Sequence, residues 1–237
     1  EIKSVIDLVG MDTGDDDAVA FQNEDLPGWG DDGVNPAQAD GGNVLYCGLA
    51  VLHDPALSLL GQAVVCKLSK ADLDEIRLAG SDERIPYFAE VLELVYGRVP
   101  LLIEIKNSNS NKSGELEQAV LDLLRPYGGE YAVQSFNPYS MEFFKKNAPQ
   151  IPRGQLSCVF GKKDFTWYKR FVFNRLKVTK ISSPDFISYA GKDLPNKYVT
   201  RTGLPVLAWT IRSNTDMEKV LPHCDNFIFE NFIPVIE

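Results

Sequence analysis

The feature that most constrains the fold of this chain is a repeated alternation of short apolar segments with amphipathic ones. Apolar runs rich in branched residues are typical of buried strands, and apolar residues at helical spacing are typical of helices packed on one side. Strands that alternate with helices pair in parallel through βαβ units. The expected strands span residues 99–105, 131–136, 155–160, 185–189, 204–211 and 226–229, and the expected helices span residues 116–124, 140–147, 165–178, 196–202 and 215–221.

The same alternation extends upstream, with a strand expected at 48–52 and helices at 70–76 and 88–95. A chain of 237 residues has room for eight such strand–helix units, which is the size of a TIM (β/α)8 barrel. We therefore predict an α/β fold of this type, formed by a single domain over residues 1–237. A doubly wound open sheet is the alternative, and its dinucleotide-binding version is disfavoured because no Gly-x-Gly-x-x-Gly turn follows a first strand.

Charge and composition limit the kinds of partner and the cellular location that we expect for this chain. The net charge is −9, and residues 1–50 hold eleven of the 33 acids but one of the 24 lysines and arginines. We therefore expect no nucleic acid partner. The sequence contains no run of 18 apolar residues, so we expect no membrane-spanning helix. A basic segment followed by an apolar one does not open the sequence, so we expect no signal peptide. The four cysteines have no Cys-x-x-Cys spacing, which is typical of reduced thiols in a cytoplasmic protein.

Polar and aromatic residues follow the apolar runs, where a barrel places its active residues. Any strand must end in polar residues, so each such position also has a purely structural interpretation. The whole set of positions is stronger evidence for an active site than any single position. It comprises His53 with Asp54, Glu104 with Lys106, residues 135–137, Trp209 and Glu230.

Glu104 and Lys106 lie two residues apart in the strand expected at 99–105. Alternate residues of a strand share a face, so both side chains should point the same way as Leu102, with Ile103 and Ile105 opposite. A carboxylate suits a hard cation and an ammonium suits a phosphate. A plain ion pair at the mouth of the barrel is the alternative.

His53 ends an apolar run and can exchange a proton near neutral pH; a surface turn histidine is the alternative. Trp209 is interpreted either as core packing or as a wall against an apolar part of a substrate. Residues 28–33 form a glycine-rich acidic turn that includes Asp32, a weak candidate for holding a cation.

The segment 162–180 carries seven bases and one acid, interleaved with aromatic residues. A basic aromatic helix suits an anionic membrane surface or a phospholipid-like ligand, and peripheral membrane contact is one prediction. An outer barrel helix with a solvated basic edge is the other.

From His53 onward, an ordered set of motifs resembles the glycerophosphodiester phosphodiesterase family. Leu102-Ile103-Glu104-Ile105-Lys106 is similar to the family's most recognisable strand. The other motifs are Val51-Leu52-His53-Asp54, residues 84–92, Val133-Gln134-Ser135-Phe136-Asn137-Pro138, Arg153-Gly154-Gln155-Leu156, Ala208-Trp209-Thr210-Ile211-Arg212 and residues 224–230.

The resemblance implies a TIM barrel, a divalent cation (Ca²⁺ or Mg²⁺), and hydrolysis of small glycerophosphodiesters to glycerol 3-phosphate and an alcohol. By position it implies that His53 is a catalytic acid/base, that Glu104 and Asp32 bind the metal, and that Lys106 and Trp209 contact the substrate.

The first fifty residues depart from the family pattern. The family's opening His-Arg-Gly corresponds to Leu8-Val9-Gly10, so its first catalytic histidine and its arginine are not found. The alternative function is therefore a catalytically impaired family member that binds a phosphodiester or a phospholipid headgroup. Loss of one group of an acid/base pair lowers the rate by about 10²- to 10⁴-fold.

Overall fold

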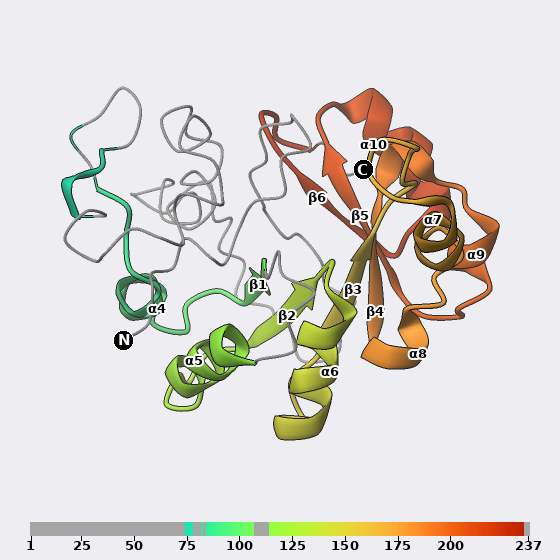
Figure 1. The fold of residues 1–237 in the computed structure, drawn as a ribbon. Coiled ribbons are helices and arrows are strands. Elements are labelled where there is room, and N and C mark those ends of the chain that lie inside the picture. The colour runs from blue at the N-terminus through green and yellow to red at the C-terminus, as the bar shows by residue number, and fades with distance from the viewer. Residues whose placement is uncertain (1–73, 78–81, 83, 107–113, 235–237) are drawn as a thin grey trace.

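The computed structural model of the protein describes residues 74–77, 82, 84–106 and 114–234. Within these residues six strands form one sheet whose order in space follows their order along the chain. Every neighbouring pair of strands is parallel, and Figure 1 shows the sheet curving, with helices along its outer side. The strands are β1 (Leu101–Glu104), β2 (Tyr131–Ser135), β3 (Arg153–Ser157), β4 (Phe186–Ala190), β5 (Val206–Ile211) and β6 (Asn226–Phe229).

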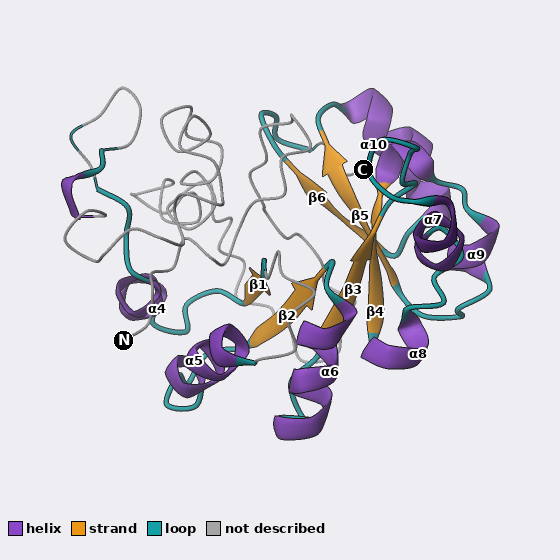
Figure 2. Cartoon of the chain, in the orientation of Figure 1, coloured by secondary structure: helices purple, strands orange, loops and turns teal. Residues whose placement is uncertain are grey.

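Helical segments connect each strand to the next, as Figure 2 shows. This arrangement confirms the predicted βαβ pattern and the α/β fold class, because parallel neighbours need a crossover connection. The segments are α4 (Phe88–Val95), α5 (Glu115–Leu124), α6 (Pro138–Asn147), α7 (Trp167–Phe173), α8 (Thr179–Ser182), η3 (Gly191–Asp193), α9 (Lys197–Thr200), α10 (Asn214–Val220) and η4 (Leu221–His223).

The two faces of the sheet have different neighbours. Ile103 and Val133 pack into the cluster that α4, α5 and α6 cover, and Ile187 and Tyr189 pack into a second cluster. Since side chains alternate along a strand, the residues between these positions point to the concave face. The predicted separation of Glu104 from Ile103 and Ile105 is confirmed, because both isoleucines belong to the helix-covered core.

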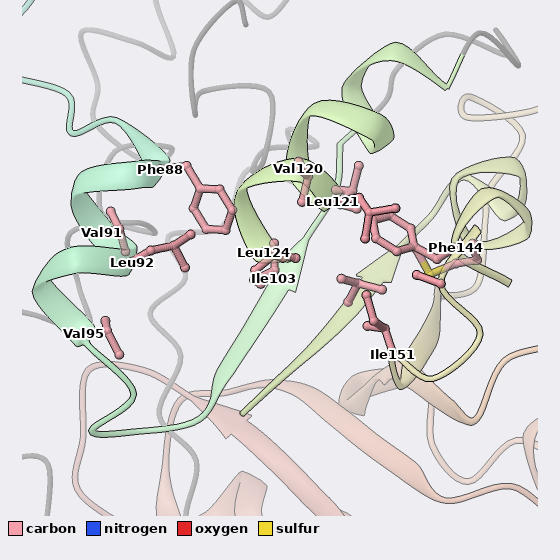
Figure 3. Packing of buried hydrophobic residues seen from close by; sticks show 14 residues of the cluster. Phe88, Val91, Leu92, Val95, Ile103, Val120, Leu121, Leu124, Phe144 and Ile151 are labelled. Carbon is pink, nitrogen blue, oxygen red and sulfur yellow. The ribbon is translucent and has the colours of Figure 1, made fainter. Parts of the chain in front are cut away.

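The largest cluster of buried apolar side chains lies between the sheet and helices α4, α5 and α6. Figure 3 shows Phe88 and Leu92 of α4 facing the side of β1 that carries Ile103, with Leu121 and Phe144 filling the space further along. Leu124 is completely buried here. This packing positions β1, and with it the residues at its end.

Local interactions set the ends of the helices. The Glu90 carboxylate accepts a hydrogen bond from the Tyr87 backbone N–H at 2.8 Å, which satisfies a donor at the start of α4. Asn137 caps α6 by accepting from the Tyr139 N–H at 3.0 Å, and Pro138 occupies the first turn, where its missing N–H has no cost.

The helix predicted over 165–178 is wrong as one continuous element. The structure has α7 and the short α8 instead, with Leu176 in a left-handed conformation (φ 50°) between them. The Asn174 side chain ties this break to the end of β3, since it bonds the Phe160 N–H and C=O at 2.9 and 3.1 Å. The break lets Leu176 enter the core beside β4, a tertiary contact that helical periodicity does not reveal.

Several boundaries also differ from the sequence-based expectation. Strand β3 begins at Arg153 rather than at residue 155, and all of its residues are buried, although three of them are polar or charged. Helix α10 begins at Asn214 rather than at residue 215, and Ser213 caps it by accepting from the Asp216 N–H at 3.1 Å. The strand expected at 48–52 and most of the helix expected at 70–76 lie outside the described residues.

Replacing Leu124 by alanine should destabilise the protein by about 2–5 kcal/mol, because the change leaves a cavity in the α5 core. Urea denaturation followed by circular dichroism measures the loss. Leu94, a helical leucine that is 43% exposed, is the matched control, and Leu94→Ala should cost less than about 1 kcal/mol. Equal losses for the two variants would contradict the placement of this core.

Candidate active site

Because all six strands are parallel, their carboxyl ends lie along one edge of the sheet. This edge carries the Glu104 and Lys106 pair from β1, Phe136 after β2, Trp209 from β5 and Glu230 after β6. In α/β barrels such an edge holds the active site. Glu104 ends β1 and Phe136 directly follows β2, whereas Trp209 lies inside β5, two residues before its end.

Glu104 and Lys106 form an ion pair, with the Lys106 Nζ 3.7 Å from the Glu104 Oε1. Their side chains are 20% and 12% exposed respectively, so water screens them less than it screens surface charges. The predicted common orientation of the two side chains is confirmed. The ion pair agrees with the interpretation of Glu104 and Lys106 as a plain ion pair at the mouth of the barrel. A contact of the pair with a cation or a phosphate stays a prediction.

Three aromatic side chains, Phe136, Trp209 and Phe160, form a wall of contacting rings. The Phe136 and Trp209 rings meet edge to face with centroids 5.7 Å apart, and Phe136 and Phe160 do so at 6.2 Å. Trp209 is partly exposed, and its buried Nε1 has no hydrogen-bond partner in the described part of the chain. Trp209 thus packs against a neighbouring ring, as the first interpretation expected, and its contact with a substrate stays a prediction.

Polar residues beside the wall support the backbone. The Ser135 hydroxyl donates to the Ile105 carbonyl and accepts from the Asn137 N–H at 3.0 Å, which joins the ends of β1 and β2. The fully buried Gln155 donates from Nε2 to the Ser135 and Phe136 carbonyls at 3.1 and 3.2 Å. These residues hold Phe136 in position, so for Ser135 and Asn137 the structural interpretation is the correct one.

Arg212 and Glu230 close the other side of the edge. The Arg212 Nε donates to Glu230 Oε1, and the Glu230 side chain is 1% exposed while Arg212 is 37% exposed. A buried carboxylate requires such a partner, because an unpaired buried charge is costly. Arg212 is therefore the ion-pair partner of Glu230. Sequence reasoning placed Glu230 at a strand end but did not identify this partner.

The concave face also carries buried polar atoms that sequence reasoning did not single out. Gln134 stands beside Glu104 in the register of β1 and β2, and its Oε1 has no hydrogen-bond partner among the described residues. The Ser188 hydroxyl and the Asn226 Nδ2 share this property. Buried polar atoms normally have partners, so this face suits a polar occupant.

Cys158 follows β3 at the same edge. Burial, reinforced by the Asp193 carboxylate, raises the pKa of its thiol to about 12. A thiol with this pKa is protonated at neutral pH, and the thiolate is the nucleophilic form. Cys158 is therefore not a candidate nucleophile.

Two predicted site residues, His53 and Asp32, lie outside the described residues. Within residues 74–77, 82, 84–106 and 114–234, no group of three or more histidine, cysteine, aspartate or glutamate side chains is placed to hold a metal ion. A search of the same ranges finds no helix with the length and apolar character needed to cross a membrane.

The sequence and the fold were compared with those of known proteins. The sequence profile of the glycerophosphoryl diester phosphodiesterase family matches residues 48–229. No curated protein sequence gives a significant match.

Three solved structures share the fold. A glycerophosphoryl diester phosphodiesterase candidate from Silicibacter pomeroyi is 18% identical, with a TM-score of 0.55, over 70% of this chain and 65% of that one. A glycerophosphodiester phosphodiesterase from Parabacteroides distasonis is 13% identical, with a TM-score of 0.53, over 71% and 70%. A phosphodiesterase from Oleispira antarctica, in complex with the product sn-glycerol-3-phosphate, is 17% identical, with a TM-score of 0.53, over 70% and 68%.

The chain thus spans about two thirds of the length of these proteins. The predicted TIM barrel is confirmed as the fold, and the described residues supply six consecutive strands of it. Since the family match covers most of the sequence, the chain belongs to the glycerophosphoryl diester phosphodiesterase family.

Proposed function

We propose that the protein hydrolyses glycerophosphodiesters to glycerol 3-phosphate and an alcohol in a metal-dependent reaction. The observation that carries the proposal is the Glu104 and Lys106 pair at the carboxyl edge of the sheet, in a member of a phosphodiesterase family. An ammonium beside a carboxylate lets one site contact both an anionic phosphate and a cation. We further propose that residues 1–237 form one domain around this site.

In the proposed reaction, water attacks phosphorus and the bond from phosphorus to the alcohol oxygen breaks. Lys106 neutralises charge on the phosphoryl oxygens, where charge develops in the transition state. His53 donates a proton to the leaving alcohol oxygen, an assignment that rests on the family resemblance. Trp209 and Phe136 pack against the carbon atoms of the glycerol, and Gln134 is placed to bond a glycerol hydroxyl.

Members of this family generally depend on a divalent cation. The Glu104 carboxylate fits one ligand of a hard cation such as Ca²⁺ or Mg²⁺, and we assign Asp32 as a second. A bound cation would stabilise negative charge on the phosphate. Glu230 is a poorer ligand, since Arg212 already occupies its carboxylate.

The alternative function is binding without turnover. It is favoured by Leu8, which stands where the family has its first histidine, because the proton released by the attacking water then has no assigned acceptor. Such a protein would bind a phosphodiester or a phospholipid headgroup through Lys106. Turnover that requires a metal ion distinguishes the two functions.

Peripheral membrane contact through 162–180 is a second part of the proposal. In this segment Trp167, Tyr168 and Phe171 are 75%, 52% and 41% exposed. Exposed aromatic side chains among lysines and arginines suit the interface of an anionic membrane.

We also propose a cytoplasmic location for the protein. Cys158 and Cys224 are both free thiols, which supports this location.

We predict chelator-sensitive release of glycerol 3-phosphate from glycerophosphocholine or glycerophosphoethanolamine in the presence of Ca²⁺ or Mg²⁺. Glu104→Gln and His53→Ala should each lower kcat/KM by about 10²-fold or more, because they remove a metal ligand and a proton donor. An enzyme-coupled assay for glycerol 3-phosphate measures the rates, with folding checked by circular dichroism.

Glu130→Gln is the matched control, because Glu130 is exposed just before β2, at the opposite end of the strands. It should retain full activity. Folded protein that releases no product with any of these substrates and metals would overturn the enzymatic proposal and leave the binding function.

For membrane contact, we predict that the double variant Trp167→Ala/Tyr168→Ala binds vesicles containing anionic phospholipid at least about threefold more weakly, because it loses apolar area at the interface. Vesicle co-sedimentation measures the binding. Tyr96 is 83% exposed after α4, and Tyr96→Ala should bind like the unmodified protein. An equal effect of both changes would refute a contact localised to this segment.

A further inference from the structure

A cleft of about 450 Å³ lies where the ends of the α7–α8 segment and α9 meet. Its lining includes Ser183 and Pro184 just before β4, and Thr202 and Leu204 just before β5. It is therefore at the amino ends of these strands, whereas Glu104, Trp209 and Glu230 lie at the carboxyl ends. Figure 1 shows α7, α8 and α9 together on the outer side of the sheet.

The lining of this cleft is strongly basic. It includes Arg175, Lys177, Lys180 and Arg201, all exposed, and contains no aspartate or glutamate. None of the four forms a salt bridge with a carboxylate of the described residues. The positive charge of the cleft is therefore not neutralised by its own surroundings.

Two aromatic rings, Phe171 and Tyr198, contact three of these cations. The Arg175 guanidinium lies 3.9 Å from the centroid of the Phe171 ring and 5.7 Å from that of Tyr198. Arg201 lies 5.9 Å from the same Tyr198 ring, and Lys177 lies 4.3 Å from Phe171. Cation–π contacts favour this arrangement, but they do not cancel the repulsion between like charges, which an anion would relieve.

The nearest acid in sequence, Asp185, is used elsewhere. Its carboxylate accepts from the Arg153 backbone N–H at 3.0 Å and pairs with the Arg153 guanidinium at 3.3 Å. On the same side, the Lys145 Nζ donates to the Ser183 hydroxyl at 2.7 Å, which adds a further positive charge beside the cleft.

We propose that this cleft binds a phosphate-bearing anion with two or more negative charges, such as a phosphomonoester or a diphosphate. Two guanidinium groups that contact the same aromatic ring can each offer paired donors to phosphate oxygens. The cleft is also large enough to take a group attached to the phosphate. This site is separate from the proposed phosphodiesterase site, which lies at the opposite ends of the strands.

The first test uses isothermal titration of inorganic pyrophosphate into the full chain, with chelator present. The double variant Arg175→Gln/Arg201→Gln should weaken binding by at least about tenfold, because it removes two charge-assisted contacts. Lys162→Gln/Lys163→Gln changes the net charge equally, outside the cleft, and should weaken binding less than about twofold if contact rather than general charge is responsible.

No pyrophosphate binding, or equal weakening by the two double variants, would overturn the proposal. The double variant Arg175→Gln/Arg201→Gln should also keep its full rate of glycerophosphodiester hydrolysis. The anion site and the phosphodiesterase site therefore succeed or fail independently.

A second arm identifies the source of the anion. Vesicles of phosphatidylcholine containing phosphatidic acid present a phosphomonoester on a membrane. If Arg175→Gln/Arg201→Gln weakens both vesicle and pyrophosphate binding by a similar factor, the cleft holds a lipid headgroup. If it weakens pyrophosphate binding alone, the cleft holds a soluble anion. Both results support the site, and unchanged binding in both arms excludes it.

Discussion

Helices cover one face of the six-stranded parallel sheet, and this one-sided packing determines where the chemistry can be. Ile103, Val133 and Ile187 pack under the helices, so alternation along the strands sends Glu104, Gln134 and Ser188 to the concave face. Parallel pairing then brings the carboxyl ends of all six strands to one edge. The ion pair, the aromatic wall and the buried polar atoms all depend on these two constraints.

The two ends of the strands have different electrostatic character. At the carboxyl edge, charges are matched: Lys106 stands beside Glu104, and Arg212 holds Glu230. At the amino ends of β4 and β5, Arg175 and Arg201 share an aromatic ring, and the cleft that they line has no acid. Matched charges suit a site that must hold both a cation and a phosphate, whereas unmatched positive charge suits a site for an anion alone.

Local pattern predicted much of this structure. The helix at 88–95 and the strand at 226–229 match the structure, because apolar spacing and the adjacent polar residues mark both ends. The common face of Glu104 and Lys106 followed from alternation alone. Features made by contacts distant in sequence were missed: the break at Leu176, the burial of the polar residues of β3, and the amide of Gln155 that holds the end of β2. Nothing in the local sequence shows that Gln155 would find carbonyl acceptors on a neighbouring strand.

A crystal structure of the protein with sn-glycerol 3-phosphate, the product of the proposed reaction, is the most direct test of the proposed site. We expect the phosphate at the carboxyl edge, within hydrogen-bond distance of the Lys106 Nζ, and the glycerol against Trp209. If this edge stays empty at a saturating concentration of glycerol 3-phosphate, the edge is not the phosphodiester site.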